Sequence, residues 1–330
     1  MHRNQGLRFA VTAAAFILVL ALLAGCAGGA APGVSATPVA AKPASEKPAA
    51  EAKPAAEKAA AFANPDLLVE TSWLSQRLDD AAIRIIDART ADEYKAGHVK
   101  GAVSVPVEDT FNPTGPKQMA GPTDQIEKLF SAKGISGDTR VIVYDNGKET
   151  KASRVLWTLE LFGHSKVAVL NGGFKKWQKD SLPVATEETK VAAAKFTAKS
   201  VPALNATKED VLAAIKKPGF AIVDSRSPEE YRGEDLRTKR GGHIPGAVNI
   251  DWRDLFTAGD APVLKSPAEL AKMYESAGVT KDKEIIVHCQ TGQRSAVSYL
   301  TLKLLGYAKV RNYDGSWQEW GNETETPIEK

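Results

Sequence analysis

Gly97–Val103 reads Gly-His-Val-Lys-Gly-Ala-Val, and Gly242–Val248 reads Gly-His-Ile-Pro-Gly-Ala-Val. Further pairs match in the same order on both sides of these stretches: Ile85–Arg89 with Ile222–Arg226, Val141–Asp145 with Ile285–Cys289, and Asn171–Trp177 with Asp314–Trp320. From Gly97 onward the spacing between matched positions stays at 143 to 145 residues, which chance similarity between short motifs would not maintain. The sequence therefore predicts a duplicated domain.

Each half alternates between two kinds of apolar pattern. Short β-branched runs bounded by polar or glycine turns predict buried parallel strands at Ile83–Ile86, Val141–Tyr144, Val167–Leu170 and their counterparts. Helical patterns lie between them at 123–133, 152–162, 267–277 and 294–305. Each half is therefore expected to be an α/β unit with helices covering a sheet. Residues 183–205 lack a period and contain Pro183 and Pro202, so we expect a connector there and domains at 62–190 and 191–330.

The composition is that of an ordinary globular protein. The 330 residues are 43% hydrophobic and 25% charged, with a formal net charge of +3. This balance excludes disorder throughout and gives no basic footprint for nucleic acid.

The start of the chain predicts export. Arg3 and Arg8 precede an almost wholly apolar run from Phe9 to Leu23, which is typical of a signal peptide. The run ends in Leu23-Ala24-Gly25-Cys26, which resembles the bacterial lipobox, so residues 1–25 are expected to be removed and Cys26 lipidated. An uncleaved anchor helix is the alternative, although the run is short for a membrane span. Both place the protein outside the cytoplasm, held at a membrane.

Residues 26–61 contain scarcely any side chains that could be buried. They are mostly Ala, Pro, Lys and Glu, which predicts a tether between the lipid and the globular part. The chain has two cysteines, Cys26 and Cys289, and lipidation occupies the sulfur of the first. Cys289 is then a lone thiol in an exported protein, which calls for either deep burial or a function.

Cys289 follows the apolar strand Ile285–Val287 and precedes a helical pattern that starts at Ser295. At such a turn backbone N–H groups converge and the helix N-terminus adds partial positive charge, so a thiolate is stabilised there. Gly292 suits the tight turn, and Arg294 can offer a fork of donors to an oxyanion.

The pattern Cys-x-x-Gly-x-Arg after an apolar strand resembles the active loop of rhodanese-family sulfurtransferases. Asp224–Arg226, Gly242–Ala247 and Tyr313–Trp317 resemble other signatures of this family, and the resemblance covers nearly all of residues 66–322. It implies two rhodanese-like domains, each a parallel five-stranded sheet flanked by helices. It also implies that the active site of the second domain faces the first.

The resemblance further implies a two-step reaction without a metal or organic cofactor. The Cys289 thiolate would take sulfur from thiosulfate or a mercapto-acid such as 3-mercaptopyruvate, and cyanide, a thiol or a protein dithiol would remove it. In this picture Arg226 binds the anionic donor, and the predicted substrate-binding set is Arg226, Arg294, Gln290, Thr291, Gly292, Gln293, Arg237 and Arg240. The loop matches neither the Cys-Arg-Lys-Gly of thiosulfate-preferring members nor the Cys-Gly-Ser-Gly of mercaptopyruvate-preferring ones. The charge of Arg294 favours thiosulfate.

The first repeat has Asp145 where the second has Cys289. Because a carboxylate cannot carry sulfane sulfur, this repeat is predicted to be non-catalytic and Arg89 to be structural. Asp87 and Asp224 are expected to hold their neighbouring arginines or to cap turns. His98 and His243 lack partners at ligand spacing, so no metal site is predicted, and His288 is expected to be structural.

Two other functions share this pattern. Cysteine phosphatases and arsenate reductases also place a cysteine and an arginine around an anion-holding loop, but the phosphatase pattern has five residues between them and this chain has four, Gln290–Gln293. The smaller ring suits sulfur better than phosphate. The other alternative is a lipoprotein that binds sulfur compounds or a partner without turnover.

Overall fold

The computed structural model describes residues 61–116 and 118–330. The predicted leader, the lipidation site Cys26 and nearly all of the predicted tether lie outside these residues. Within the described part, no helix has the length and apolar character needed to cross a membrane.

The first repeat contains a parallel sheet of five strands. Their spatial order is β1 (Leu68–Val69), β6 (Val167–Leu170), β5 (Arg140–Tyr144), β2 (Ile83–Asp87) and β4 (Val103–Ser104). All the pairings between neighbours are parallel. A separate antiparallel pair joins β3 (His98–Val99) to β7 (Val184–Ala185).

The second repeat builds the same sheet again. The order β8 (Asn205–Ala206), β12 (Val310–Tyr313), β11 (Glu284–His288), β9 (Phe220–Asp224) and β10 (Val248–Asn249) repeats the first sheet strand for strand, also with parallel pairing. The predicted duplication and the predicted pair of five-stranded parallel sheets are therefore confirmed.

Ten α-helices are present in the described part of the chain. In the first repeat they are α1 (Thr71–Ser75), α2 (Ala91–Ala96), α3 (Thr123–Ala132), α4 (Thr150–Leu161) and α5 (Gly173–Lys179). In the second they are α6 (Lys208–Ala214), α7 (Pro228–Arg232), α8 (Pro267–Ser276), α9 (Ser295–Leu304) and α10 (Ser316–Trp320). Short 3-10 helices occupy Pro65–Leu67, Val107–Thr110, Pro202–Leu204 and Trp252–Leu255. The four helices expected at 123–133, 152–162, 267–277 and 294–305 are all present, within about two residues.

Alternation along the strands gives each sheet two buried faces. In the first repeat Ile142 packs with side chains of α1, α2 and α5, whereas its neighbours Val141 and Val143 pack with those of α3 and α4. In the second repeat Ile286 packs with α6 and α10, and Ile285 packs with α8 and α9. The α3–α4 face and the α8–α9 face belong to one continuous core, so the two repeats share buried apolar surface.

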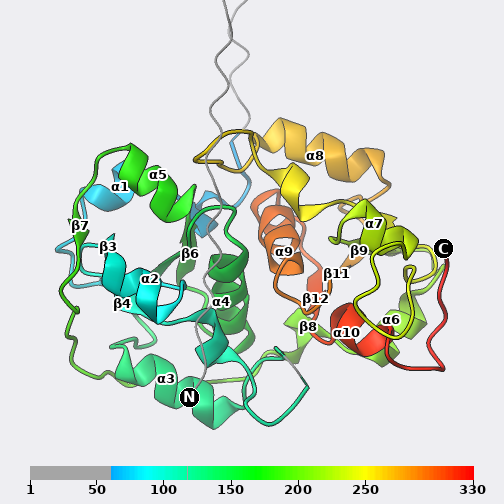
Figure 1. Cartoon of the computed structure of the whole chain (residues 1–330), viewed down its shortest axis with the longest axis horizontal. Helices are drawn as coiled ribbons and strands as arrows, with labels where there is room; N and C mark the ends of the chain where they lie inside the picture. Colours follow the sequence, from blue (N-terminus) through cyan, green and yellow to red (C-terminus); the bar gives the residue numbers. More distant parts are fainter. Residues whose placement is uncertain (1–60, 117) are drawn as a thin grey trace, which may run out of the picture. The chain divides into compact units, whose positions relative to one another are not determined.

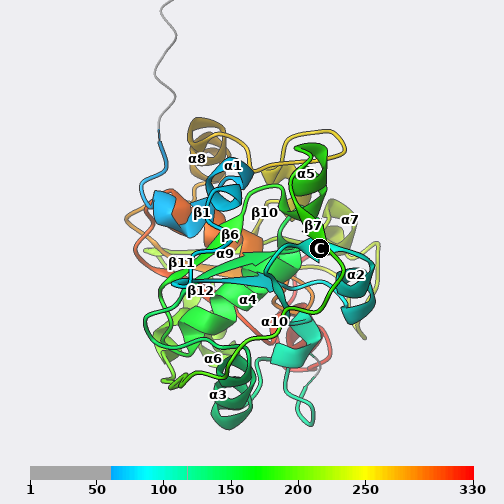
Figure 2. The same cartoon turned by 90° about the vertical axis from the view of Figure 1, so that its left-hand side faces the viewer.

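Helices α4 and α9 lie side by side where the repeats meet (Figures 1 and 2). Glu160 of α4 accepts hydrogen bonds from the Tyr299 hydroxyl at 2.7 Å and from Lys303 Nζ at 2.6 Å, both on α9. The connector also contributes, because the N–H groups of Lys199 and Val201 donate to carbonyl groups at the end of α4. Residues on both sides of the predicted domain boundary near 190 therefore contribute to the contact between the two repeats.

Candidate active site

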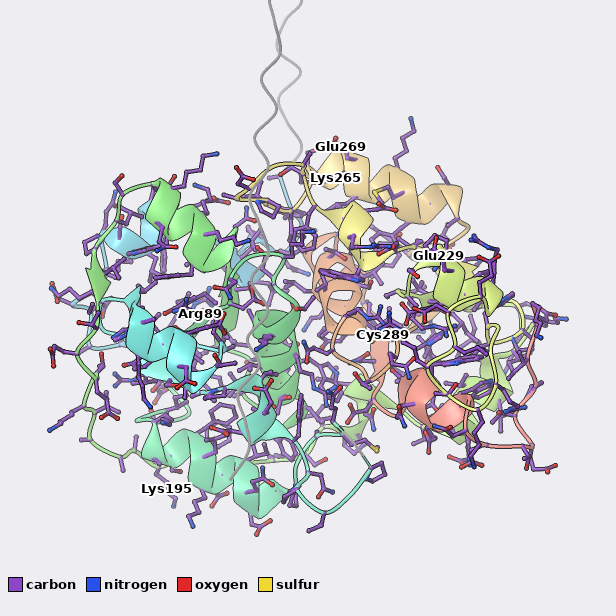
Figure 3. All side chains as sticks on the ribbon, viewed as in Figure 1. Arg89, Lys195, Glu229, Lys265, Glu269 and Cys289 are labelled. Atoms are coloured by element: carbon purple, nitrogen blue, oxygen red, sulfur yellow. The ribbon has the colours of Figure 1, made fainter. Side chains whose placement is uncertain are left out.

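Cys289 is the first residue after β11, and α9 begins six residues later at Ser295. The thiol therefore occupies the strand-to-helix turn that the sequence predicts (Figure 3). Gly292 has a φ of +74°, in the left-handed region that glycine adopts without strain, and it closes the turn.

The turn directs hydrogen-bond donors at the sulfur. The Ser295 hydroxyl lies 3.6 Å from Cys289 Sγ, and the backbone N–H groups of Thr291 and Ser295 act on the sulfur so as to lower its pKa. Burial by itself raises the pKa of the Cys289 thiol. The positive charge of Arg294 and the donors of the loop outweigh burial, so the pKa lies below its ordinary value.

The side chain of Cys289 has no exposed surface and forms no disulfide. Burial is typical of inert core thiols, whose pKa is raised. Here the charge of Arg294 and the donors of the loop produce the opposite shift of the Cys289 pKa. The site therefore has the electrostatics of a nucleophile although it lies beneath the surface.

A second loop, after β12, holds the main chain of the cysteine. The N–H of Cys289 donates to Ser316 Oγ at 3.3 Å, and its carbonyl accepts a bond from the N–H of Trp317 at 3.0 Å. Asn312, at the end of β12, donates to the Gly292 carbonyl at 2.9 Å and accepts from the Ser295 hydroxyl at 2.7 Å. The Cys289 loop is thus fixed at its start, its middle and its end.

Arg294 is held by a buried carboxylate. Its Nη1 and Nη2 donate to the two oxygens of Glu230 at 2.6 and 2.8 Å. Burial opposes ionisation of Glu230, but the bonds from Arg294 lower its pKa below the usual range. The ion pair keeps the guanidinium charge of Arg294 near the sulfur. Because Nη1 and Nη2 each donate to Glu230, one edge of the guanidinium is already occupied by a protein carboxylate.

Comparison with known proteins gives the family. The model of the rhodanese-like domain matches the chain twice, at residues 70–180 and 207–323. The chain belongs to the rhodanese family. The two matches fall on the two repeats, which confirms the predicted tandem arrangement.

Relatives match about four fifths of this chain. A thiosulfate sulfurtransferase of Azotobacter vinelandii is 36% identical over 270 residues, covering 81% of this chain and 98% of the relative. A sulfur carrier protein of Thermus thermophilus is also 36% identical, covering 82% and 98%. The crystal structure of a 3-mercaptopyruvate sulfotransferase from Escherichia coli matches with a TM-score of 0.69 and 34% identity, covering 76% and 98%. This rhodanese protein is therefore a sulfurtransferase.

The guanidinium of Arg226 is buried and bonded within the second repeat. It is 1% exposed, its Nε and Nη2 bond to Asp224, and Nη2 also donates to the Gly242 carbonyl. Arg89 makes the same bonds to Asp87 and Gly97 in the rhodanese repeat without a cysteine. Because both repeats share these contacts, they serve the fold. The geometry does not support the predicted donor-binding role of Arg226, whereas the expectation that both aspartates hold their arginines is confirmed.

The two arginines predicted as further ligands, Arg237 and Arg240, have different surroundings. Arg237 reaches the outer side of the site, with Nε 3.4 Å from Glu230 Oε1, and is half exposed. Arg240 is committed elsewhere, since its guanidinium donates to the carbonyl groups of Trp320 and Thr326. It supports the C-terminal segment, and the geometry does not support the predicted ligand role.

The loop residues lie around the sulfur through their main chain. Gln290 packs toward α10, where its carbonyl accepts a bond from the N–H of Gln318. The carbonyl of Gln293 accepts a bond from the N–H of Ala296 at the start of α9. The His288 ring lies 3.6 Å from Asp224, and burial lowers its pKa. A neutral histidine that faces β9 fits the expected structural role.

The first repeat shows what this turn does in the rhodanese fold when cysteine is absent. The Asp145 carboxylate accepts bonds from the N–H groups of Gly147 at 2.8 Å, Lys151 at 2.9 Å and Ala152 at 3.3 Å. Burial raises its pKa, against the effect of these bonds. The same turn therefore gathers amides around an oxygen in one repeat and around a sulfur in the other.

Sequence reasoning missed Asn312, Glu230 and the groups that reach the site from the first repeat. The sequence holds a partial signal for Glu230, because it matches Glu93 of the first repeat. Nothing in the sequence indicates that Glu230 binds Arg294. In the residues that the structure describes, no three His, Cys, Asp or Glu side chains cluster so as to hold a metal ion.

Proposed function

We propose that this protein moves sulfane sulfur from thiosulfate to an acceptor through a persulfide on Cys289. The observation that carries the proposal is the Cys289 thiol at the end of β11, 3.6 Å from the Ser295 hydroxyl, whose pKa is lowered by Arg294 and by the donors of the loop. A thiolate of this kind is the form that attacks sulfur.

The chemistry needs one cysteine and no other redox partner. The Cys289 thiolate attacks the outer sulfur of thiosulfate, the S–S bond of the donor breaks, and its electron pair leaves with sulfite. The thiol of Cys289 has become a persulfide. An acceptor such as cyanide then attacks the outer sulfur, leaves as thiocyanate, and returns the thiolate.

The loop donors serve both halves of this cycle. The N–H groups of Thr291 and Ser295 stabilise negative charge on sulfur before the first attack and after the second. Arg294 adds a positive charge that favours a compact dianion such as thiosulfate. The Azotobacter relative, named a thiosulfate sulfurtransferase, supports this choice of donor, and 3-mercaptopyruvate is the alternative donor.

The same reaction can use different natural acceptors of the persulfide sulfur. The Thermus relative is named a sulfur carrier protein, which favours a protein thiol or dithiol as the natural acceptor. Cyanide then serves as a convenient substitute in the assay.

We expect a gain of about 32 Da on the peptide that contains Cys289 after incubation with the true donor. Intact-protein and peptide mass spectrometry should be run after thiosulfate and after 3-mercaptopyruvate, each followed by cyanide. Cyanide must remove the added mass and release thiocyanate. Persulfide formation without release to cyanide, thiols or dithiols would favour a binding protein, and no added mass with either donor would contradict the proposal.

We further propose that the protein is exported and anchored through lipid on Cys26, which the sequence of residues 9–26 supports. In the native host, the mature protein is expected in the membrane fraction, to begin at Cys26 and to carry lipid there, whereas Cys26→Ser should carry no lipid and keep residues 1–25. Fractionation and mass spectrometry of the N-terminal peptide measure this. A membrane-bound native protein that has no lipid on Cys26 or keeps residues 1–25 would contradict lipid anchoring.

A further inference from the structure

Arg154 of α4 belongs to the non-catalytic repeat but lies against the active-site loops. Its side chain has no exposed surface. Nη1 is 2.6 Å from Asp314 Oδ1 in the second repeat, and Nη2 donates to the Gln118 carbonyl in the first at 2.9 Å. The ring of Trp157 covers the guanidinium at 4.6 Å. One planar group therefore joins a carboxylate of one repeat to the backbone of the other.

Asp314 opens the loop that holds Cys289 in place. After Gly315 come Ser316, Trp317 and Gln318, and these three bind the main chain of Cys289 and Gln290. The second oxygen of Asp314 accepts a bond from the N–H of Ala120 of the first repeat at 2.8 Å. Asp314 thus contacts the first repeat through both oxygens: Oδ1 forms an ion pair with Arg154, and Oδ2 accepts the hydrogen bond from Ala120.

Arg154 also touches the Cys289 loop itself. A Cβ built on Gly292 would lie 2.6 Å from Arg154 Nη1 and 2.9 Å from Asp314 Oδ1. The absence of a side chain at this position leaves the space that the guanidinium needs. Gly292 therefore meets two demands, the left-handed turn and the approach of an arginine from the other repeat.

Stabilisation of the fold alone does not explain why Arg154 and Asp314 are paired. Desolvation of a buried arginine and carboxylate offsets much of their attraction, so a buried ion pair is poor evidence for stability. The Arg154 guanidinium is nonetheless fixed in place, because Nη2 donates to Gln118 and the ring of Trp157 covers its face, so its charge stands at a defined position beside Asp314 Oδ1. The position of Arg154 between Asp314 and Gly292 points to that use.

We propose that Arg154 is a positioning residue for sulfur transfer, which holds the Cys289 loop in its amide-lined geometry through Asp314 and Gly292. The non-catalytic repeat then supplies part of the active-site framework. This inference rests on the proposed function, since positioning has meaning only for a reacting sulfur. Arg154 acts through its neighbours and is not assigned a contact with the donor.

The test uses the full chain with Cys26→Ser, in which Cys289 is the remaining cysteine. Variants Arg154→Met, Arg154→Lys and Asp314→Asn are compared with Lys303→Met, which removes a different contact between the repeats, at the far end of α9. The measurements are kcat and KM for thiosulfate with cyanide, thermal unfolding, and the ultraviolet absorbance of the Cys289 thiolate as a function of pH.

Arg154→Met is expected to lower kcat about 100-fold, because small displacements of a reacting group have effects of this size. The thiolate should form at higher pH, since the loop amides no longer converge on the sulfur. Arg154→Lys should recover part of the rate, because it keeps the charge but loses the fork. Lys303→Met should stay within about twofold of the parent, as expected for a contact remote from the reaction.

Arg154→Met with kcat within about threefold of the parent and an unchanged thiolate titration would overturn the inference, since displacement of the loop predicts a far larger loss. An equal loss in Lys303→Met would also overturn it, because the effect would then reflect a loosened interface. If Arg154→Met does not fold, Arg154→Lys and Asp314→Asn decide by the same criteria. A parent without turnover would contradict the proposed function, while the thiolate titration would still test Arg154.

Discussion

Replacement of Cys289 by serine is expected to lower thiocyanate formation from thiosulfate and cyanide by more than about 10³-fold, the scale seen when a covalent nucleophile is removed. A hydroxyl cannot form a persulfide, and the loop that lowers the thiol pKa would not ionise an alcohol at neutral pH. The binding of the second repeat to the first should be unaffected, because Cys289 is held through its main chain. Steady-state assays at saturating thiosulfate measure the loss.

The two cysteines of the chain provide a matched control. Cys26→Ser removes the other thiol and should leave turnover of detergent-solubilised protein unchanged. Mass spectrometry should then find the added sulfur in Cys26→Ser but not in Cys289→Ser. Retention of turnover in Cys289→Ser would show that sulfur is carried elsewhere and would contradict the assignment.

Replacement of Arg294 by glutamine is expected to lower the rate about 10- to 100-fold at pH 7, because each unit of pKa changes the thiolate-to-thiol ratio tenfold. In the native protein Arg294 favours the charged form of Cys289 and lowers its pKa against the effect of burial. Without Arg294 the pKa of the thiol rises, so less thiolate is present at neutral pH. The buried Glu230 carboxylate also loses both of its bonds from Arg294 and keeps only the Ser227 N–H and the half-exposed Arg237 as partners.

The rate loss in Arg294→Gln is expected to depend on pH. Activity requires the thiolate, so the rate rises with pH through the pKa of Cys289. Removal of Arg294 moves this rise to higher pH, and the difference from the native protein should shrink as the pH increases. A rate profile from pH 5 to pH 10, with thiolate absorbance measured in parallel, tests the prediction.

Arg232→Gln is the control for Arg294→Gln. Arg232 lies on α7 near Glu230 but is exposed and pairs with Glu234 at the surface, so its loss should leave both the rate and the profile unchanged. The rate of Arg294→Lys should lie between those of the native protein and Arg294→Gln, since lysine keeps the charge but loses the bidentate pair with Glu230. A profile of Arg294→Gln that matches the native one would show that the charge does not control the thiol.

The repeat pattern was sufficient to predict most of the fold. Matching the Ile85–Arg89 motif to Ile222–Arg226 predicts equal strands in two equal sheets, because parallel α/β units have few alternative topologies. It also predicts that Asp224 holds Arg226. Assignment of Arg226 to donor binding followed from resemblance alone. The geometry does not support this assignment, because the Asp–Arg pair is common to both repeats and buried in each.

The sequence by itself determined the duplication, the sheets, the position of Cys289 at a strand-to-helix turn and the replacement of cysteine by Asp145 in the first repeat. All of these depend on local pattern and short-range geometry. Only the tertiary structure decided which charges meet: Arg294 with Glu230, and Arg154 with Asp314. These partners are separated by 64 and 160 positions in the chain, and no local period links such residues before the sheets and the interface between the repeats bring them together.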